Sequence, residues 1–309
     1  LHLSIRRQRQ MCIRDRNIIS QLQVNVFVNE EFSDAFEFHP NLQNVENKHE
    51  VYIAGAGPAG LFAALELIEQ GLKPIIIERG KNVRDRRRDL AAMNKEGKVN
   101  PESNYCYGEG GAGTYSDGKL YTRSTKRGNI LKSLQWFVHF GATERILQEA
   151  HPHIGTNKLP GIIANMREAI IECGGEVWFD TKLTDIIIEN NQIKGIEINH
   201  DKKIKTSSLI LATGHSARDI FRMLDEKKVL IEAKPFALGV RVEHHQSLID
   251  SAQYHCPIGT ERNEFLPPAS YSLVSQEAGR GVFSFCMCPG GIIAPASTDE
   301  GELVVNGWS

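Results

Sequence analysis

The stretch over 51–80, "VYIAGAGPAGLFAALELIEQGLKPIIIERG", constrains the fold of this chain more than any other. An apolar strand over 51–54 runs into a G-x-G-x-x-G turn, and a helical pattern continues from Ala59 to about Gln70. A second apolar strand follows over 74–77. Strand, glycine-rich turn, helix and strand in this order form a βαβ unit, whose two strands are parallel. We therefore predict an α/β fold built on a parallel sheet.

The three glycines of the turn have separate uses in a dinucleotide site. Gly55 permits the tight turn, Gly57 lets the backbone approach a pyrophosphate, and Gly60 lets the helix pack closely on the strand. The helix N-terminus offers unpaired N–H groups and a partial positive charge to the phosphates. Glu78 follows Gly60 by 18 residues, close to the separation at which an acid accepts hydrogen bonds from ribose hydroxyls. The dinucleotide contacts predicted in this unit are Gly55, Gly57, Pro58, Ala59, Gly60 and Glu78.

A run of charged residues, "ERGKNVRDRRRDL" over 78–90, leaves two interpretations open. In one, the run forms a solvated amphipathic helix whose arginines Arg84, Arg87 and Arg88 face water. In the other, one or two arginines reach the adenosine or phosphate end of the cofactor, and the candidates are Arg79 and Arg87.

The middle of the chain predicts helices and then strands. Helical spacing occurs over 128–150 and 158–173, and short alternating runs follow over 176–214. These runs predict one strand, a three-stranded β-meander with a turn at Asn190-Asn191, and a last strand. The last strand ends in small residues that let a backbone pass under a cofactor, and these are Ala212, Thr213 and Gly214.

Four parts are predicted along the chain. Residues 49–233 form a three-layer, Rossmann-like domain of the kind that binds FAD or NAD(P), with the β-meander on one side. Residues 234–309 begin an inserted α+β substrate domain, because strand and loop patterns replace helical ones there. Residues 17–48 form a short N-terminal segment. Residues 1–16 lack both helical and strand periodicity, which indicates a non-native leader, with a native basic arm as the alternative.

We also expect the chain to be a fragment that is truncated at its C-terminus. Its last residues, "GELVVNGWS", stop just after a strand-like run.

Composition excludes several classes of function. The formal net charge of −2 provides no field that would recruit nucleic acid or an anionic membrane surface. No run approaches the roughly 18 apolar residues that a membrane-spanning helix needs. Six cysteines without a C-x-x-C pair indicate a reducing compartment. We therefore expect a cytoplasmic protein with no nucleic-acid or membrane partner.

Several long motifs follow one another from residue 51 to the end. They are "GAGPAG", "ERG", "ESNYCYGEGGAGTYSDGKLYTR" (102–123), "HPHIGTNKL" (151–159), "LILATGHSARD" (209–219), "PFALGVRVEH" (235–244) and "FSFCMCPGG" (283–291). Together they resemble the largely uncharacterised family of FAD-dependent dehydrogenases within the glutathione-reductase-type flavoprotein superfamily. The resemblance implies a non-covalently bound FAD and does not name a substrate.

The resemblance gives a role to the glycine-rich loop over 108–120. In such flavoproteins this loop returns to the cofactor and lines the pyrophosphate and the flavin. Its glycines would let backbone N–H groups face the cofactor without obstruction, and these are Gly110, Gly111 and Gly113. Ser116 would donate to a flavin carbonyl or a phosphate, and Lys119 would place positive charge near the N1–C2=O edge of the flavin. By the same resemblance, Leu183 would contact the adenine through its backbone.

One feature of the glycine-rich loop and one feature of a later strand each allow two interpretations, a structural one and a chemical one. Asp117 is either a turn residue before Gly118 or a catalytic group, and the turn is favoured. Cys286 and Cys288 are either a redox pair or two residues on one face of a strand. The structural interpretation is favoured, because residues at i and i+2 do not turn toward each other.

The histidines are open to the same two kinds of interpretation. His244 and His245 with His255 and Cys256 match no common zinc spacing, so polar surface or turn positions are favoured over a metal site. In the 151–159 segment, which the resemblance places near the flavin, His151 or His153 is either a proton donor or a locally bonded loop residue.

The function we expect is that of an FAD-dependent oxidoreductase, a dehydrogenase that transfers a hydride through FAD and binds a small-molecule substrate. NAD(P)H is the candidate electron donor, although the chain shows no second unit of strand, G-x-G-x-x-G turn and helix that would indicate a dedicated NAD(P) domain. The alternative is a flavin-bearing RNA-modification or RNA-binding protein, and the absence of a basic, aromatic-interleaved sequence argues against it. We expect the chain as it stands to bind FAD weakly or to fold poorly.

Overall fold

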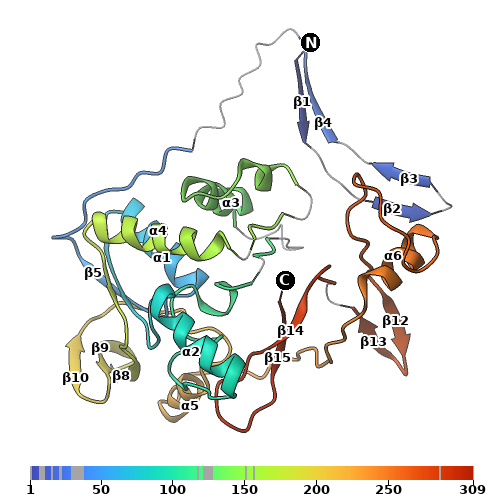
Figure 1. Ribbon diagram of the computed structural model, residues 1–309. Helices are drawn as coiled ribbons and strands as arrows, with labels where there is room; N and C mark the ends of the chain where they lie inside the picture. The colour runs from blue at the N-terminus through green and yellow to red at the C-terminus, as the bar shows by residue number, and fades with distance from the viewer. Residues whose placement is uncertain are drawn as a thin grey trace.

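The computed structural model describes residues 2–6, 11–14, 17–20, 23–28, 38–116, 118–120, 128–149, 152–155, 157–284 and 287–308. Figure 1 shows the arrangement of its helices and strands. Within these residues, no helix combines the length and the apolar character that crossing a bilayer requires.

A four-stranded parallel sheet forms the centre of the fold. Its strand order is β11 (Leu209–Leu211), β5 (Glu50–Ala54), β6 (Lys73–Ile77) and β7 (Glu176–Trp178). All three pairings are parallel. Parallel strands need cover on both faces, which is why β6 reads as the nearly continuous apolar run "KPIII" and is buried along its whole length. The predicted α/β fold with a parallel sheet is therefore confirmed.

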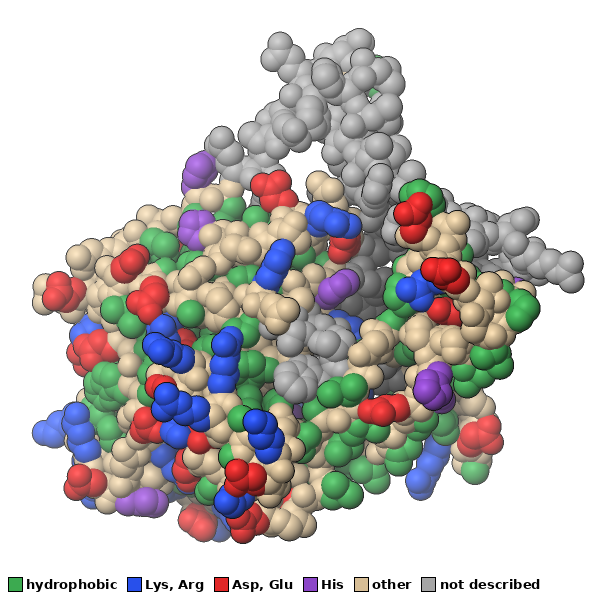
Figure 2. All heavy atoms as spheres, in the orientation of Figure 1, with side chains coloured by type: hydrophobic (Ala, Val, Ile, Leu, Met, Phe, Trp, Pro, Cys, Tyr) green, Lys and Arg blue, Asp and Glu red, His purple; other side chains and the backbone are tan. Residues whose placement is uncertain are grey.

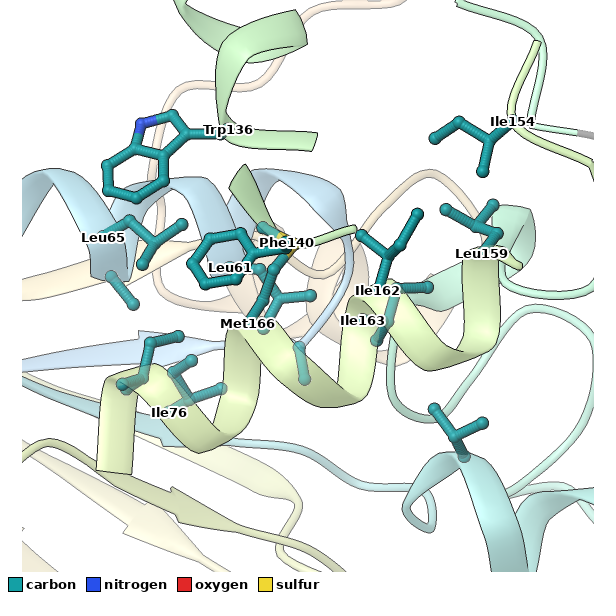
Figure 3. Close-up of a cluster of buried hydrophobic side chains, with 14 of the residues drawn as sticks. Leu61, Leu65, Ile76, Trp136, Phe140, Ile154, Leu159, Ile162, Ile163 and Met166 are labelled. Atoms are coloured by element: carbon teal, nitrogen blue, oxygen red, sulfur yellow. The ribbon is translucent and has the colours of Figure 1, made fainter. Parts of the chain in front are cut away.

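Helices cover one face of the sheet. Helix α1 (Pro58–Glu69) connects β5 to β6, and α3 (Ile130–His139) and α4 (Leu159–Glu172) pack beside it. Figure 3 shows Leu61 and Leu65 of α1 against Met166 of α4, with Phe140 and Trp136 closing the cluster. Most of these side chains are almost fully buried, so this layer is the main hydrophobic core.

The other face of the sheet is covered by a β-meander and a helix. Strands β8 (Leu183–Glu189), β9 (Gln192–Ile198) and β10 (Lys202–Lys205) form an antiparallel sheet, and α5 (Arg218–Glu226) follows β11. Asn190 and Asn191 both have positive φ, as a two-residue hairpin turn requires. Tyr52, Ala54, Ile75 and Ile77 of the sheet pack against this layer.

Helix α2 (Val83–Glu96) follows β6 and packs against α4. The Asn82 side chain caps its N-terminus by accepting hydrogen bonds from the Arg84 and Asp85 backbone N–H groups, and Gly97 ends it with a φ of 70°. Two 3₁₀ turns complete this half, η1 (Gly111–Gly113) and η2 (Glu144–Leu147).

The predicted helix over 128–150 is shorter in the structure. Helix α3 ends at His139, and the chain then turns at Gly141, whose φ is 111°. This conformation favours glycine and cannot continue a helix. The helix predicted over 158–173 corresponds to α4 within two residues at each end.

The chain after 228 contains fewer regular elements. They are α6 (Gln246–Tyr254), the hairpin of β12 (Val274–Glu277) and β13 (Arg280–Phe283), and the pair β14 (Ile292–Pro295) and β15 (Val305–Trp308). The strand-like motif over 235–244 forms no strand, because no described segment pairs with its backbone.

At the N-terminus, the described residues form two antiparallel strand pairs. Strand β1 (His2–Arg6) pairs with β4 (Gln23–Phe27), and β2 (Met11–Arg14) pairs with β3 (Asn17–Ser20). Strand pairing uses backbone groups that every residue except proline supplies, so it needs no apolar periodicity.

Candidate functional site

A cavity of about 420 Å³ lies at the carboxyl ends of the parallel strands. The last residues of β5, β6 and β11, which are Ala54, Ile77 and Leu211, all line it. Its wall is completed by residues of 55–59, 78–79, 106–108, 111–113, 181–183 and 212–220. This edge of an open parallel sheet is where α/β proteins bind their ligands.

The glycine-rich turn after β5 is shaped by close contacts. Gly55 has a φ of 108°, and a Cβ there would lie 2.5 Å from the Ala212 carbonyl oxygen. A Cβ at Gly60 would lie 1.9 Å from the Gly55 carbonyl oxygen, so only glycine lets α1 approach β5 this closely. A Cβ at Gly57 would meet nothing nearer than the Gly111 Cα at 3.9 Å. Gly57 therefore leaves open space beside the N-terminus of α1.

Glu78 connects three loops around this turn. Its carboxylate accepts hydrogen bonds from the backbone N–H groups of Ala56 at 2.7 Å, Gly80 at 2.8 Å and Gly108 at 2.9 Å. The residue is only 5% exposed, yet it borders the cavity. The sequence predicts a ribose contact for Glu78, and the structure adds a role that the sequence analysis missed: the carboxylate holds the loops together.

Arg86 organises the loop that carries the glycine-rich stretch. This side chain is fully buried and donates hydrogen bonds to the carbonyl oxygens of Asn104, Tyr105, Glu109 and Gly111, and to the Thr114 hydroxyl. The five distances lie between 2.8 and 3.1 Å. All five N–H groups of the guanidinium are thereby used.

The sequence analysis did not separate Arg86 from its neighbours, although a signal was present. Val83, Arg86, Leu90 and Met93 are the buried residues of α2, and their spacing of three and four places Arg86 on the apolar stripe.

Glu109 fixes the same loop to two helices. Its buried carboxylate accepts a hydrogen bond from the Val83 backbone N–H at 2.7 Å, at the start of α2. Arg167 of α4 donates to both carboxylate oxygens, at 2.9 and 3.1 Å. Burial raises the pKa of Glu109, and the hydrogen bond from Val83 and the charge of Arg167 oppose that change.

Four charged residues form a network at the cavity, and three of them, Arg79, Lys182 and Asp219, line its wall. Arg79 donates to Glu102 at 2.6 Å and lies 3.1 Å from Asp219, while Lys182 lies 3.0 Å from both carboxylates. The Arg79 guanidinium also lies over the Tyr107 ring, 4.3 Å from its centre. Burial raises the pKa of Tyr107 to about 12, with Arg79 opposing and Asp219 adding to the change.

The two carboxylates of this network are kept ionised. Burial tends to raise the pKa of Asp219, but the hydrogen bond from Lys182 and the charges of Arg79 and Lys182 lower it overall. The pKa of Glu102 is likewise lowered, because hydrogen bonds from Arg79 and Lys182 outweigh the effect of burial.

Most of the residues that the sequence predicts as cofactor contacts line this one cavity. They are Gly55, Gly57, Pro58, Ala59, Glu78, Arg79, Gly111, Gly113, Leu183, Ala212, Thr213 and Gly214. These residues come from five separate segments, so the fold brings together positions that are up to 159 residues apart. Gly60 and Gly110 lie just behind the wall, where they permit close packing.

Three predicted contacts are not brought to the cavity. Arg87 is exposed and borders a separate surface groove between α2 and α4. The Ser116 hydroxyl donates to the Gly113 carbonyl at 2.7 Å. The Lys119 ammonium lies 2.7 Å from the Cys288 Sγ. Each interpretation of the arginine run therefore holds for part of it. Arg84, Arg87 and Arg88 are exposed, as expected for a solvated helix, while Arg79 borders the cavity.

The structure describes only some of the remaining sequence-based candidates. Asp117, His151 and Cys286 fall outside the described residues. His153 forms an isolated bridge with Lys119, and the His244 ring lies 3.2 Å from the Tyr271 hydroxyl. Among the residues that the structure describes, no three histidine, cysteine or acidic side chains are grouped as metal ligands.

The donor set of the cavity fits a dinucleotide. The first backbone N–H groups of α1 have no partners within the helix and can donate to an anion, and Gly57 leaves room beside them. Arg79 and Lys182 supply charge at the other end, and Leu183 and Ile220 supply apolar surface. A phosphate-containing ligand with an apolar ring system therefore matches the chemistry of the wall.

Comparison with known families identifies two parts of the chain. Residues 48–91 match the family described as "FAD binding domain", and residues 235–309 match "FAD-dependent protein, C-terminal domain-like". The first match contains the glycine-rich turn, α1 and Glu78.

Two curated proteins are similar in sequence. An uncharacterized protein of Clostridium beijerinckii is 40% identical over 301 residues, which is 96% of this chain and 55% of that protein. The thiamine thiazole synthase of Aeropyrum pernix is 28% identical over 152 residues, which is 49% of this chain and 44% of that protein. The chain thus spans about half the length of the curated relatives that it matches.

Solved structures show weaker similarity. THI4 of Thermovibrio ammonificans is 16% identical with a TM-score of 0.38, over 60% of this chain and 64% of that chain. Glycine oxidase of Bacillus cereus is 17% identical with a TM-score of 0.31, over 59% of each chain. These values are too low to carry an argument. The family matches, together with the cavity at the end of the parallel sheet, identify FAD as the cofactor of this protein.

Proposed function

We propose that this chain contributes the FAD-binding part of an oxidoreductase that acts on a small-molecule substrate. Residues 49–233 would form the FAD domain, and 234–309 would begin a substrate domain inserted into it. When bound, FAD supplies hydride transfer at the N5 atom of its flavin. The observation that carries the proposal is the cavity, which gathers the glycine-rich turn, the loop held by Glu78 and the end of β11.

The residues of the cavity wall have distinct roles in this proposal. Gly57 and the N-terminus of α1 hold the pyrophosphate, because open space and unpaired N–H groups meet there. Arg79, Lys182 and Leu183 hold the adenosine, and Gly111 and Gly113 pass close to the cofactor on the other side. The small residues 212–214 let the β11 end approach it without steric conflict.

Several finer points belong to the same proposal. The chain would be cytoplasmic and would belong to the glutathione-reductase-type flavoprotein superfamily. NAD(P)H is the electron donor that we propose. The motivation is the acidic, cysteine-poor composition and the set of motifs described above. The RNA-modification alternative stays a prediction, and a binding assay with transfer RNA tests it.

The experiment records visible absorption of the purified chain after FAD has been added, before and after anaerobic addition of NADH or NADPH. We expect flavin bands that bleach with one of the two donors. A chain that binds no added FAD would contradict the proposal. Flavin bands that neither donor bleaches would reject only the donor.

A pair of glycine variants tests whether FAD binds in the cavity. Gly57→Val adds a side chain into open space without a strained φ, since Gly57 has a φ of −74°. We expect it to weaken FAD binding by roughly a hundredfold, because the side chain occupies the space of the ligand. Gly161→Ala is the control, because a Cβ there meets nothing within 4 Å and Gly161 lies in α4, outside the cavity wall. Equal FAD affinity of the two variants would place the cofactor elsewhere.

A further inference from the structure

Arg86 is a buried cation whose hydrogen-bond partners are all neutral. Its relative exposure is 0%, and its five N–H groups bond to four backbone carbonyls and one hydroxyl. A buried charge is expensive unless it is paired with an opposite charge and hydrogen-bonded. The hydrogen bonds are present here, but none of them comes from a carboxylate. Burial lowers the pKa of Arg86, which reflects the same cost.

The carbonyls that Arg86 binds belong to one loop. They come from Asn104, Tyr105, Glu109 and Gly111, while residues 106–108 and 111–113 of the same loop line the cavity. Arg86 itself does not line the cavity. It therefore lies behind the loop, on the side away from the ligand, and draws negative carbonyl ends toward itself.

The glycines of the loop fit around this side chain. Gly108 has a φ of 116°, and a Cβ there would lie 2.6 Å from the Arg86 Cδ. A Cβ at Gly110 would lie 2.2 Å from the Thr114 hydroxyl oxygen, which accepts a hydrogen bond from Arg86. Part of the glycine density of "GEGGAG" is thus explained by a buried arginine, and not by the ligand alone.

We infer that Arg86 is a positioning residue for the cofactor, which sets the 104–114 loop against the cavity and supplies positive potential to the pyrophosphate through that loop. The inference rests on the proposed function, because it assigns the anion to FAD. A cation one loop away from a phosphate, in surroundings of low polarity, is screened little by water. The charges of Glu78 and Glu109 already act on Arg86 without a hydrogen bond to it, and the phosphates of the ligand add to that negative charge.

The test compares Arg86→Ala, Arg86→Lys and Arg88→Ala, with FAD affinity measured by flavin fluorescence and stability by urea unfolding without FAD. Arg88 is the matched control, since it is an exposed arginine of the same helix. We expect FAD affinity to fall about a hundredfold in Arg86→Ala and about tenfold in Arg86→Lys, whose ammonium keeps the charge but has only three donors. Arg88→Ala should bind FAD within about twofold of the unchanged chain.

Chemical rescue separates a positioning role from a merely structural one. Millimolar guanidinium should restore FAD affinity to Arg86→Ala by about tenfold, because the ion fits the vacated site and replaces the same donors. It should leave the unchanged chain and Arg88→Ala unaffected. A folded Arg86→Ala that binds FAD normally, or one whose weakened binding guanidinium does not restore, would overturn the inference.

If Arg86→Ala does not accumulate as folded protein, Arg86→Lys tests the inference in its place. A tenfold loss of FAD affinity at an unchanged urea midpoint supports the inference, and normal affinity overturns it. Failure of the unchanged chain to bind FAD would reject the proposed function. Normal FAD binding by the unchanged chain and by all three variants would reject only the role of Arg86.

Discussion

Two regions of this molecule contain apolar residues of the same kinds, but one region buries them and the other exposes them. In the sheet, Ile53 and Ile76 are 0% exposed. In the segment over 235–244, Phe236, Leu238 and Val240 are 83%, 91% and 88% exposed. Figure 2 shows green hydrophobic side chains at the surface of the part of the molecule that follows residue 228. The two regions therefore differ in burial and not in hydrophobic content.

The difference shows that an alternating pattern specifies which side chains share a face of a strand and does not specify whether that face is buried. Phe236, Leu238, Val240 and Val242 recur every second residue, as in a half-buried strand. The pattern states which side chains would share one face, but burial needs a second surface to cover that face. Strand β6 has helices on one side and the meander on the other, whereas the described chain offers no such surface to 235–244.

The largest effect is expected from shortening a core side chain. Ile76→Ala removes three carbon atoms from a position that is fully buried between the sheet and α1. We expect it to lower the free energy of unfolding by about 3 kcal/mol, through lost burial and the cavity left behind. Urea denaturation followed by tryptophan fluorescence measures this change. A loss below about 1 kcal/mol would mean that the first region is packed no better than the second.

A smaller effect is expected from acid, in the charged network at the cavity. The folded-state pKa of Glu102 lies below its ordinary value of 4.5, and that of Asp219 below 3.8. Their ion pairs therefore contribute stability at pH values above these ordinary values and lose it as the pH falls through the lower, folded-state values. Both carboxylates are partly exposed, so the contribution should not exceed about 1 kcal/mol.

The measurement is the urea midpoint between about pH 6 and pH 3, for the unchanged chain and for Glu102→Gln. The unchanged chain should lose stability more steeply on acidification than the variant. Parallel curves for the two proteins would show that Glu102 contributes nothing through its charge.

The smallest effect is expected in the exposed segment. Leu238→Ala removes a side chain that is 91% exposed, so the free energy of unfolding should change by less than about 0.5 kcal/mol. Limited chymotrypsin digestion sharpens the comparison with the sheet. Cleavage after Phe236, which lies in exposed chain without regular structure, should precede any cleavage after Tyr52, which is buried in β5. Protection of Phe236 would mean that the segment is covered after all.

Local sequence determined the βαβ unit and its turn. The strands, α1 and the glycine at each tight contact follow from apolar periodicity and from the conformations that only glycine adopts, as Gly55 and Gly60 illustrate. The same applies to the hairpin at Asn190-Asn191, since two residues with positive φ are a local requirement. Twelve of the 26 residues of the cavity wall could be named in advance, because the turn, the loop and the end of β11 each carry a local motif.

Tertiary structure alone decided which charged side chains hydrogen-bond to the loops that form the cavity wall. The sequence singles out Glu78 only as a ribose contact and does not single out Glu109. The structure shows that each also accepts a backbone hydrogen bond from a segment that is distant along the chain. Among the clustered arginines of 84–88, only Arg86 is buried, because the turn of α2 points it at a loop more than fifteen residues further along the chain. Ser116 hydrogen-bonds to Gly113 and Lys119 contacts Cys288, and neither side chain lines the cavity. The physical reason is that a motif fixes local conformation, whereas hydrogen-bond partners and burial depend on what the rest of the chain brings alongside.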